Sequence, residues 1–221
     1  MADLDWRPAQ RPQRQPIEGE LVRLEPLDPE FHGADLYASS IGAERTWHYL
    51  PYGPFAAEEE FLSWLRERAV LDDPLAYTII DRGAGAARGI ATLMSIEPDH
   101  GSIEIGHIWL APALQRTRQA TEAIYLLSRY VFDVLGNRRY EWKCDAANAP
   151  SRRAAERFGF TFEGVFRQHR IVKGRNRDTA WYSMTDAEWP SRRAAFEAWL
   201  SFDNFDAEGR QLRSLGELRR E

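Results

Sequence analysis

The sequence has only one cysteine, Cys144, among its 221 residues. A single thiol excludes an intrachain disulfide and a structural metal site built from cysteines, because both need more than one sulfur. We therefore expect Cys144 to be a small buried thiol in a strand. The sequence predicts no metal site.

Long apolar runs and an excess of basic charge are also missing. No stretch approaches the ~20 apolar residues of a membrane helix, and no signal-peptide core follows Met1. The formal net charge of -5 gives no basic field of the kind that dominates binding to nucleic acid. We therefore expect a cytoplasmic protein with no membrane and no DNA partner. A mildly acidic surface fits an amine-bearing partner.

Length and composition fit one domain with extensions at both ends, since 43% of the residues are hydrophobic and 29% are charged. We expect an N-terminal arm or tail over residues 1–19, a domain over 20–185 and a helical extension over 186–221. The arm is rich in proline, glutamine and arginine and lacks periodicity. Its arginines could contact RNA, but a plain surface arm is the simpler interpretation; they are Arg7, Arg11 and Arg14.

Hydrophobic periodicity predicts the secondary structure. Strands are expected at residues 21–27, 76–81, 89–96, 102–110, 139–144, 160–167 and 179–184. Helices are expected at 31–40, 57–71 and 120–135, after the capping residue Asn148, and from Glu188 onward. The fold class is therefore α+β, an α/β sandwich around a mixed sheet.

The junction between the strand at 102–110 and the helix at 120–135 is the most informative segment. A tight loop before a helix offers unpaired backbone N–H groups and the positive end of the helix dipole, which together hold phosphate. The loop reads Gln115-Arg116-Thr117-Arg118-Gln119-Ala120. Most junctions of this kind bind nothing, so geometry alone leaves anion binding open.

The same loop resembles the pyrophosphate loop of the GNAT N-acetyltransferase superfamily. Gln115 and Ala120 match its outer positions, and Arg118 stands where a glycine is expected. A second, independent series resembles the branch that contains the ribosomal-protein N-terminal acetyltransferases: Asn148-Ala149-Pro150-Ser151-Arg152-Arg153, Gly159-Phe160 and Glu163-Gly164. Together the matches extend over residues 18–185, and an ordered series is more specific than one loop.

The resemblance implies the GNAT fold, with a mixed, mostly antiparallel central sheet splayed between two strands and flanked by helices. It implies acetyl-CoA as cosubstrate, with its pantetheine arm against the strand at 108–110 and its pyrophosphate on the loop amides. The residues implied in binding are Ile108, Trp109, Leu110, Gln115, Arg116, Thr117, Arg118, Gln119, Ala120, Asn148, Ser151, Arg152 and Arg153. A solvated helix face is the alternative for the two arginines after Ser151.

The implied reaction is direct attack of a neutral primary amine on the thioester. The acceptor is a protein N-terminus, an amino acid or a small amine. Ser151 matches the serine near the sulfur and is the candidate acid. Glu104 and His107 are candidate bases, but they lie on opposite strand faces unless a bulge intervenes. Trp47, Tyr49 and Tyr52 match the acceptor pocket, with core packing as the alternative.

Three other hypotheses stay open at this point. The fold could serve as a non-catalytic CoA-binding or sensor module, because Arg118 departs from the loop pattern and the base is uncertain. The arginine-bearing arm could make the chain an RNA-associated interaction protein. The apolar stripe of the C-terminal helix, with Trp199, Phe202 and Phe205, could pack on its own domain or form the seam of a homodimer.

Overall fold

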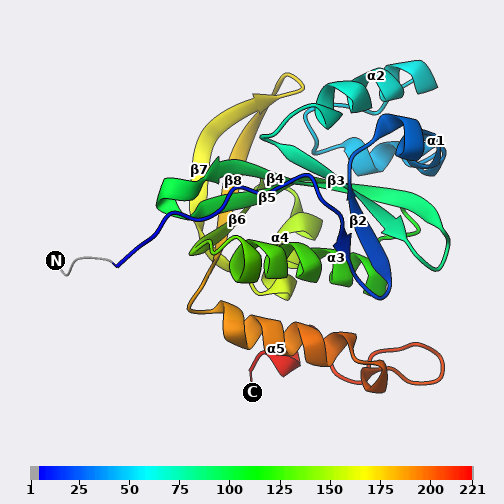
Figure 1. Cartoon of the computed structure of the whole chain (residues 1–221). Helices are drawn as coiled ribbons and strands as arrows, with labels where there is room; N and C mark the ends of the chain where they lie inside the picture. Colours follow the sequence, from blue (N-terminus) through cyan, green and yellow to red (C-terminus); the bar gives the residue numbers. More distant parts are fainter. Residues whose placement is uncertain (1–4, 221) are drawn as a thin grey trace.

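The computed structural model describes residues 5–220. It shows an eight-stranded mixed sheet with helices on both faces (Figure 1). The strand order is β1-β2-β3-β4-β5-β6-β8-β7, and β5 and β6 form the only parallel pair among these strands. The strands are β1 Ile17–Glu18, β2 Val22–Pro26, β3 Leu75–Asp81, β4 Ala86–Glu97, β5 Ser102–Leu110, β6 Arg139–Asp145, β7 Thr161–Val172 and β8 Arg175–Thr185.

Helices lie on both faces of the sheet. They are α1 Pro29–Ser40, α2 Glu58–Ala69, α3 Arg118–Arg129, α4 Ala149–Phe158, α5 Trp189–Leu200 and α6 Leu215–Leu218. In Figure 1, α1 and α2 lie above the sheet and α3 and α4 lie below it, and α5 lies outside α3. The helix expected at 120–135 is confirmed, with its last turn, Tyr130–Val134, wound as a π-helix. Asn148 caps α4 as expected.

Strand alternation divides the core between the two faces of the sheet. On β3, Tyr77 and Ile79 belong to the apolar cluster under α3, whereas Ala76 and Ile80 belong to the cluster under α1 and α2. Both clusters are fully buried at their centres. The sandwich inferred from periodicity is therefore confirmed.

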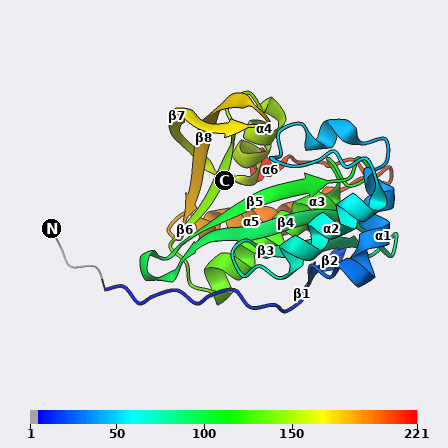
Figure 2. The same ribbon diagram turned by 90° about the horizontal axis from the view of Figure 1, so that it is seen from above.

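The hairpin of β7 and β8 is longer than the sequence predicts. The expected strands at 160–167 and 179–184 stop where the residues become charged and polar, so no hydrophobic alternation marks the rest. Backbone pairing nevertheless continues to Val172 and Arg175, with Arg170 opposite Arg177. Only Lys173 and Gly174 remain as the turn, both with positive φ. In Figure 2 the hairpin lies on the opposite side of the molecule from α1 and α2, with α4 beside it.

The arm is held against the domain over its described residues. The amides of Ala9 and Gln10 donate to the carbonyls of Pro98 and Leu135. Arg14 donates to the carbonyls at the end of α2 and pairs with Asp72 at 3.1 Å. The guanidinium of Arg14, one of the three arginines considered for RNA, is therefore engaged within the chain.

The C-terminal extension covers α3 from below (Figure 1). Trp189, Phe196 and Trp199 of α5 are at most 4% exposed, and Tyr125 of α3 packs on Phe196 with ring centroids 5.6 Å apart. Of the two partners left open for the apolar stripe, its own domain is the one observed for these residues. Phe202 is the exception, at 80% exposed.

Candidate active site

Strands β5 and β6 separate along the sheet and open a cleft. Their pairing joins Ser102–Ile105 to Arg139–Trp142 and then stops. The later residues of β5 pair only with β4, and those of β6 pair only with β8. A cleft of about 1060 Å³ lies at this gap and is lined from both strands. Because the two strands separate, residues from both faces of β5 and from both faces of β6 line one cavity.

A bulge on β5 brings both candidate bases to this cleft. The register between β4 and β5 shifts between Ile90 and Thr92, so one extra residue is accommodated on β5. His107 has φ +48°, in the left-handed region. Because of this bulge, Glu104 and His107 line the same cavity, although residues three positions apart on a regular strand point to opposite faces.

Glu104 is a buried carboxylate with a cationic neighbour. It accepts hydrogen bonds from Nζ of Lys143 at 2.9 Å and from Oγ of Ser95 at 3.3 Å. Lys143 also pairs with Glu141 at 2.7 Å. Burial raises the pKa of Glu104 above its usual value, and the charge of Lys143 offsets this in part. The group is thus a better proton acceptor than an ordinary glutamate, and it faces the cleft.

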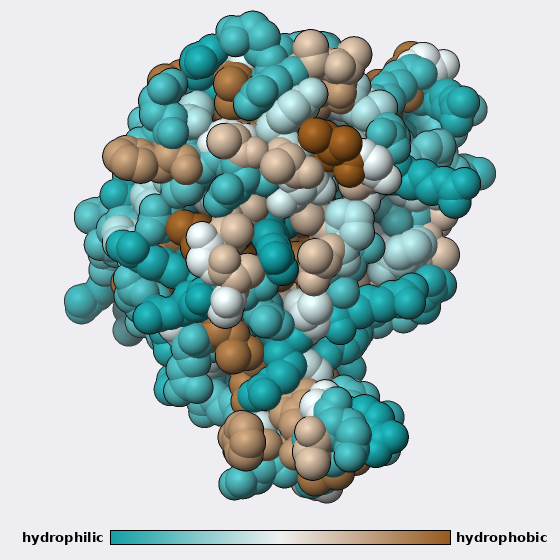
Figure 3. Space-filling view, turned by 90° about the vertical axis from the view of Figure 1, so that its right-hand side faces the viewer, coloured by the Kyte–Doolittle hydropathy of each residue, from teal (hydrophilic) through white to brown (hydrophobic). Residues whose placement is uncertain are grey.

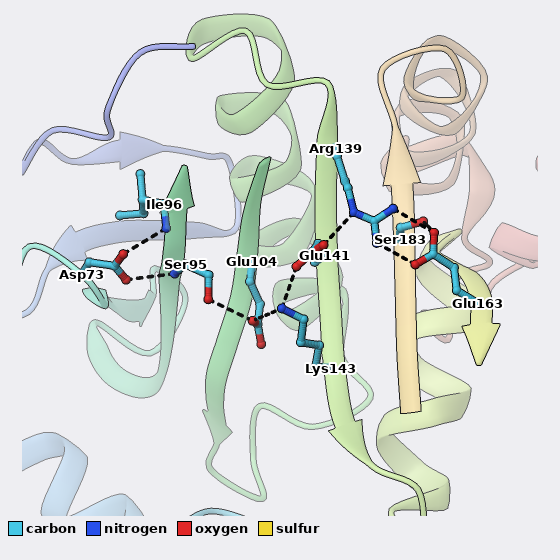
Figure 4. A network of polar contacts seen from close by, with 9 residues as sticks. All are labelled: Asp73, Ser95, Ile96, Glu104, Arg139, Glu141, Lys143, Glu163 and Ser183. Carbon is cyan, nitrogen blue, oxygen red and sulfur yellow. Dashed lines mark hydrogen bonds and ion pairs between the residues drawn. The ribbon is translucent and has the colours of Figure 1, made fainter. Parts of the chain in front are cut away.

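Glu104 belongs to a network of polar contacts that links β4, β5, β6, β7 and β8 (Figure 4). Arg139 joins Glu141 at 2.6 Å and makes a two-point contact with Glu163 at 2.6 and 2.8 Å. Oγ of Ser183 donates to Glu163 at 2.7 Å. The network fixes the separation of the strands where they still pair, so Glu104 and Lys143 have one defined geometry at the mouth of the gap.

His107 is poorly suited to accept a proton. Burial, with the charges of Arg68 and Arg177, lowers its pKa to about 4. Its Nδ1 lies 2.8 Å from the hydroxyl of Tyr52, and the two rings stack with centroids 5.5 Å apart. A neutral imidazole held in this way shapes the cleft, and Glu104 remains the stronger candidate base.

Ser151 lies in the first turn of α4, on the side of the gap away from Glu104. Its amide donates to Oδ1 of Asn148 at 3.1 Å, which fixes the turn. Nε1 of Trp142 donates to Oγ of Ser151 at 3.1 Å. The hydroxyl oxygen therefore already accepts a hydrogen bond, and the hydroxyl can direct its own proton towards the sulfur of Cys144, with which it also interacts, or into the cleft. Cys144 is buried in β6, as expected, and burial raises the pKa of its thiol.

The loop before α3 has the geometry of a helix N-terminus with free amides. Oγ of Thr117 accepts from the amide of Ala120 at 3.1 Å, and the side chain of Gln115 donates to the carbonyl of Leu110 at 2.9 Å. The amides of Arg118 and Gln119 have no intrahelical acceptor. The left-handed residue is Arg116, with φ +61°. Ala120 is therefore a weaker candidate than the sequence indicates, because its amide is already used.

The arginines of the predicted site have different partners. Arg118 donates to the carbonyl of Leu200 at 2.8 Å and lies 4.0 Å from the ring centroid of Phe205, so the C-terminal extension holds its guanidinium. Arg152 donates to the hydroxyl of Tyr182 at 3.0 Å and does not line the cleft. Strand β8 therefore holds the guanidinium of Arg152 away from the cleft. Arg153 does line the cleft.

Of the three aromatic residues expected around the acceptor, Trp47 lies in the core, whereas Tyr49 and Tyr52 lie at or beside the cleft. Trp47 is 1% exposed and stacks on Trp109 with centroids 4.8 Å apart, so it is a core residue and not an acceptor contact. Trp109 is equally buried, and only its backbone can serve the cleft. Tyr49 lines the cleft, and its hydroxyl donates to the carbonyl of Ala147 at 3.1 Å. Tyr52 does not line the cleft itself, but its hydroxyl contacts His107, which does.

Several lining residues have no counterpart in the predicted set. Arg157 is four residues after Arg153 on α4, so helical spacing could have placed it on the same face. Trp199, Phe205 and Gln211 line the cleft from the C-terminal extension, which no local sequence signal places there. Figure 3 shows the molecule from another side, with a lobe below the main body. Because Trp199, Phe205 and Gln211 line the cleft, the extension forms one end of it.

Residues 5–220 contain neither a group of three or more metal-ligating side chains nor a membrane-spanning helix. No group of three or more His, Cys, Asp or Glu side chains there is arranged to hold a metal ion. None of the described helices has both the length and the apolar character needed to cross a membrane.

Comparisons with known proteins bear on the family and the fold. Residues 22–161 match the model of the "Acetyltransferase (GNAT) domain" family. A GCN5-related N-acetyltransferase from Brucella melitensis is 50% identical, with a TM-score of 0.96 over 98% of this chain and 99% of that one. The Bacillus subtilis protein "Putative ribosomal N-acetyltransferase YdaF" is 29% identical over 75% of this chain and 90% of its own length.

A more distant structure shares the fold. It is that of the Salmonella typhimurium acetyl transferase that modifies the N-terminal serine of 50S ribosomal subunit protein L7/L12. It is 21% identical, with a TM-score of 0.67 over 77% of this chain and 99% of that one.

Proposed function

Because this chain belongs to the GNAT acetyltransferase family, we propose that it transfers an acetyl group from acetyl-CoA to a primary amine in the cleft between β5 and β6. One observation supports this most strongly. The unpaired edge of β5, the N-terminus of α3 and Ser151 all border one continuous cavity. A thioester arm, a diphosphate and a proton donor would meet there.

The residues of the cleft fit coenzyme A, which supplies the activated acetyl thioester. The free edge of β5 after Ile105 offers backbone groups to an extended arm, as an added strand would. The amides of Arg118 and Gln119 suit a diphosphate. Arg153 and Arg157 supply positive charge nearby. We propose these groups, with Asn148, Ile108 and Leu110, as the cosubstrate site.

The proton transfers are assigned to opposite sides of the gap. Glu104, on the face with Lys143, would take the proton of the incoming ammonium, directly or through water. Ser151, on the face with α4, would give a proton to the departing thiolate, assisted by Trp142. An amine can then enter from one face while the thioester enters from the other.

Arg118 no longer favours a non-catalytic module. Its side chain is drawn away to Leu200 and Phe205, so it does not block the loop amides. We propose that the extension over 186–221 completes the cosubstrate end of the domain over 20–185. The residues before 20 act as an arm that is fastened to this domain.

A protein N-terminus is the proposed acceptor. The support is the name of the Bacillus relative, "Putative ribosomal N-acetyltransferase YdaF", whose length this chain covers almost entirely, together with the N-terminal serine that the Salmonella protein modifies. The N-terminal serine on which the Salmonella protein acts makes a peptide that begins with serine the natural first test.

The purified protein is expected to release CoA from acetyl-CoA when such a peptide is supplied. A saturating concentration of CoA, at about 100 times its Kd, stabilises the fold by about 2.7 kcal/mol. For a chain of this size, the melting temperature should rise by at least about 5 °C. Thiol release is measured with a thiol-reactive dye. An unchanged melting temperature together with no thiol release from any amine would contradict the proposal.

A further inference from the structure

A second groove continues from the acceptor side of the cleft. It has a volume of about 880 Å³ and lies between the loop of residues 44–54 and the tip of the β7–β8 hairpin. The cleft and the groove share four lining residues, which makes them neighbours along one path: Arg45, Tyr49, Asp145 and Arg177. The other end of the cleft is closed by α3 and the extension. The groove is therefore where the rest of an acceptor would lie.

The groove carries more positive than negative charge. Its cations are Arg45, Lys173, Arg175 and Arg177, and its anions are Glu44 and Asp145. One oxygen of Asp145 is already used, because it accepts from the amide of Ala147 at 2.8 Å. This excess contrasts with the whole chain, whose net charge is -5. A local cationic groove on an acidic protein selects for anionic ligands by steering and by repulsion of cations.

Arg177, like Arg45, is a cation that lines both cavities. Its Nε is buried and has no hydrogen-bond partner within residues 5–220. Its charge also helps to lower the pKa of His107, so it lies near the reacting end of the cleft. A buried guanidinium donor without an acceptor is costly, and a carboxylate is its best-matched partner. Lys173, in contrast, already donates to the carbonyl of Trp47 at 2.9 Å.

We propose that this groove binds the residues that follow the acceptor amine and that it selects an acidic peptide, with a carboxylate close to the N-terminus bound by Arg177. This inference rests on the proposed function, since it names the substrate class for the same site. Arg175 and Arg45 extend the positive surface along the path of the peptide.

Three peptides of equal length with N-terminal serine and an amidated C-terminus test this selection. Aspartate, glycine or lysine occupies the second and third positions. The kcat/KM of the acidic peptide should exceed that of the glycine peptide by about tenfold and that of the lysine peptide by more, and both ratios should shrink at high salt. Free aspartate as acceptor shows whether the carboxylate alone is sufficient or a peptide is required.

The substitution Arg177→Gln should bring the ratio of acidic to glycine peptide close to one. Arg11→Gln makes the same charge change at a residue that lines neither cavity, and it should keep the ratio. Melting curves check that both variants fold. Equal kcat/KM values for the three peptides, or a preference that survives Arg177→Gln, would overturn the inference.

Fluorescence polarisation of the labelled peptides separates this inference from the proposed function. It measures binding to the groove without turnover, with the label at the C-terminus. Tighter binding of the acidic peptide that is lost in Arg177→Gln supports the groove even if no thiol is released. Indifference of binding to peptide charge contradicts the groove even if acetyl transfer is observed.

Discussion

Replacing Ser151 with alanine is expected to lower kcat by about 10²-fold, while the KM for acetyl-CoA changes by less than about threefold. The hydroxyl is the one group in the first turn of α4 that can donate a proton into the cleft while Trp142 donates to its oxygen. The amide of residue 151, which binds Asn148, is unchanged by the substitution. The loss should therefore fall on the chemical step, and steady-state kinetics with both substrates varied measures it.

Ser191→Ala is a matched control for this experiment. Ser191 also follows a proline in the first turn of a helix, but it is exposed on α5 and its hydroxyl donates to the carbonyl of Glu188. It should keep the wild-type kcat. An unchanged kcat in Ser151→Ala, or a loss confined to KM, would remove Ser151 as the acid.

Replacing Glu104 with glutamine is expected to lower kcat by about 10²-fold or more and to change the pH profile. Burial raises the pKa of Glu104, and only its ionised form can accept a proton. Wild-type activity should therefore rise with pH through a value above that of an ordinary glutamate. Glutamine cannot titrate, so this ascending limb should disappear. The measurement is kcat/KM over pH 5 to 9 at constant ionic strength.

His107→Asn is the comparison that separates the two candidate bases. Asparagine tolerates the left-handed backbone at this position, where φ is +48°. Because the pKa of His107 is lowered to about 4, the histidine is already neutral throughout the measured range. The ascending limb should persist in His107→Asn. Its disappearance there, with retention in Glu104→Gln, would assign the base to His107 instead.

The sequence was sufficient for the features that depend on local pattern. Helical spacing predicts α3, and the capping residue Asn148 predicts the start of α4. Ser151 then lies in the first turn of α4 because of its position in the sequence. Strand alternation predicts most of the sheet. These features follow from residues that are close in the chain, so one sequence contains them.

Features that depend on distant contacts could not be predicted. The bulge at His107 arises from the register of β4 against β5, and the polar end of the β7–β8 hairpin has no hydrophobic signal. The role of Arg118 depends on Leu200 and Phe205, about eighty residues further on. Trp47 is a core residue because several aromatic side chains surround it in space.

A crystal structure with CoA bound would test the central claim most directly. We expect the diphosphate on the first turn of α3, the arm beside the unpaired edge of β5 and the sulfur within hydrogen-bonding reach of Oγ of Ser151. CoA bound elsewhere on the molecule, with β5 and β6 hydrogen-bonded to each other past Ile105, would contradict it.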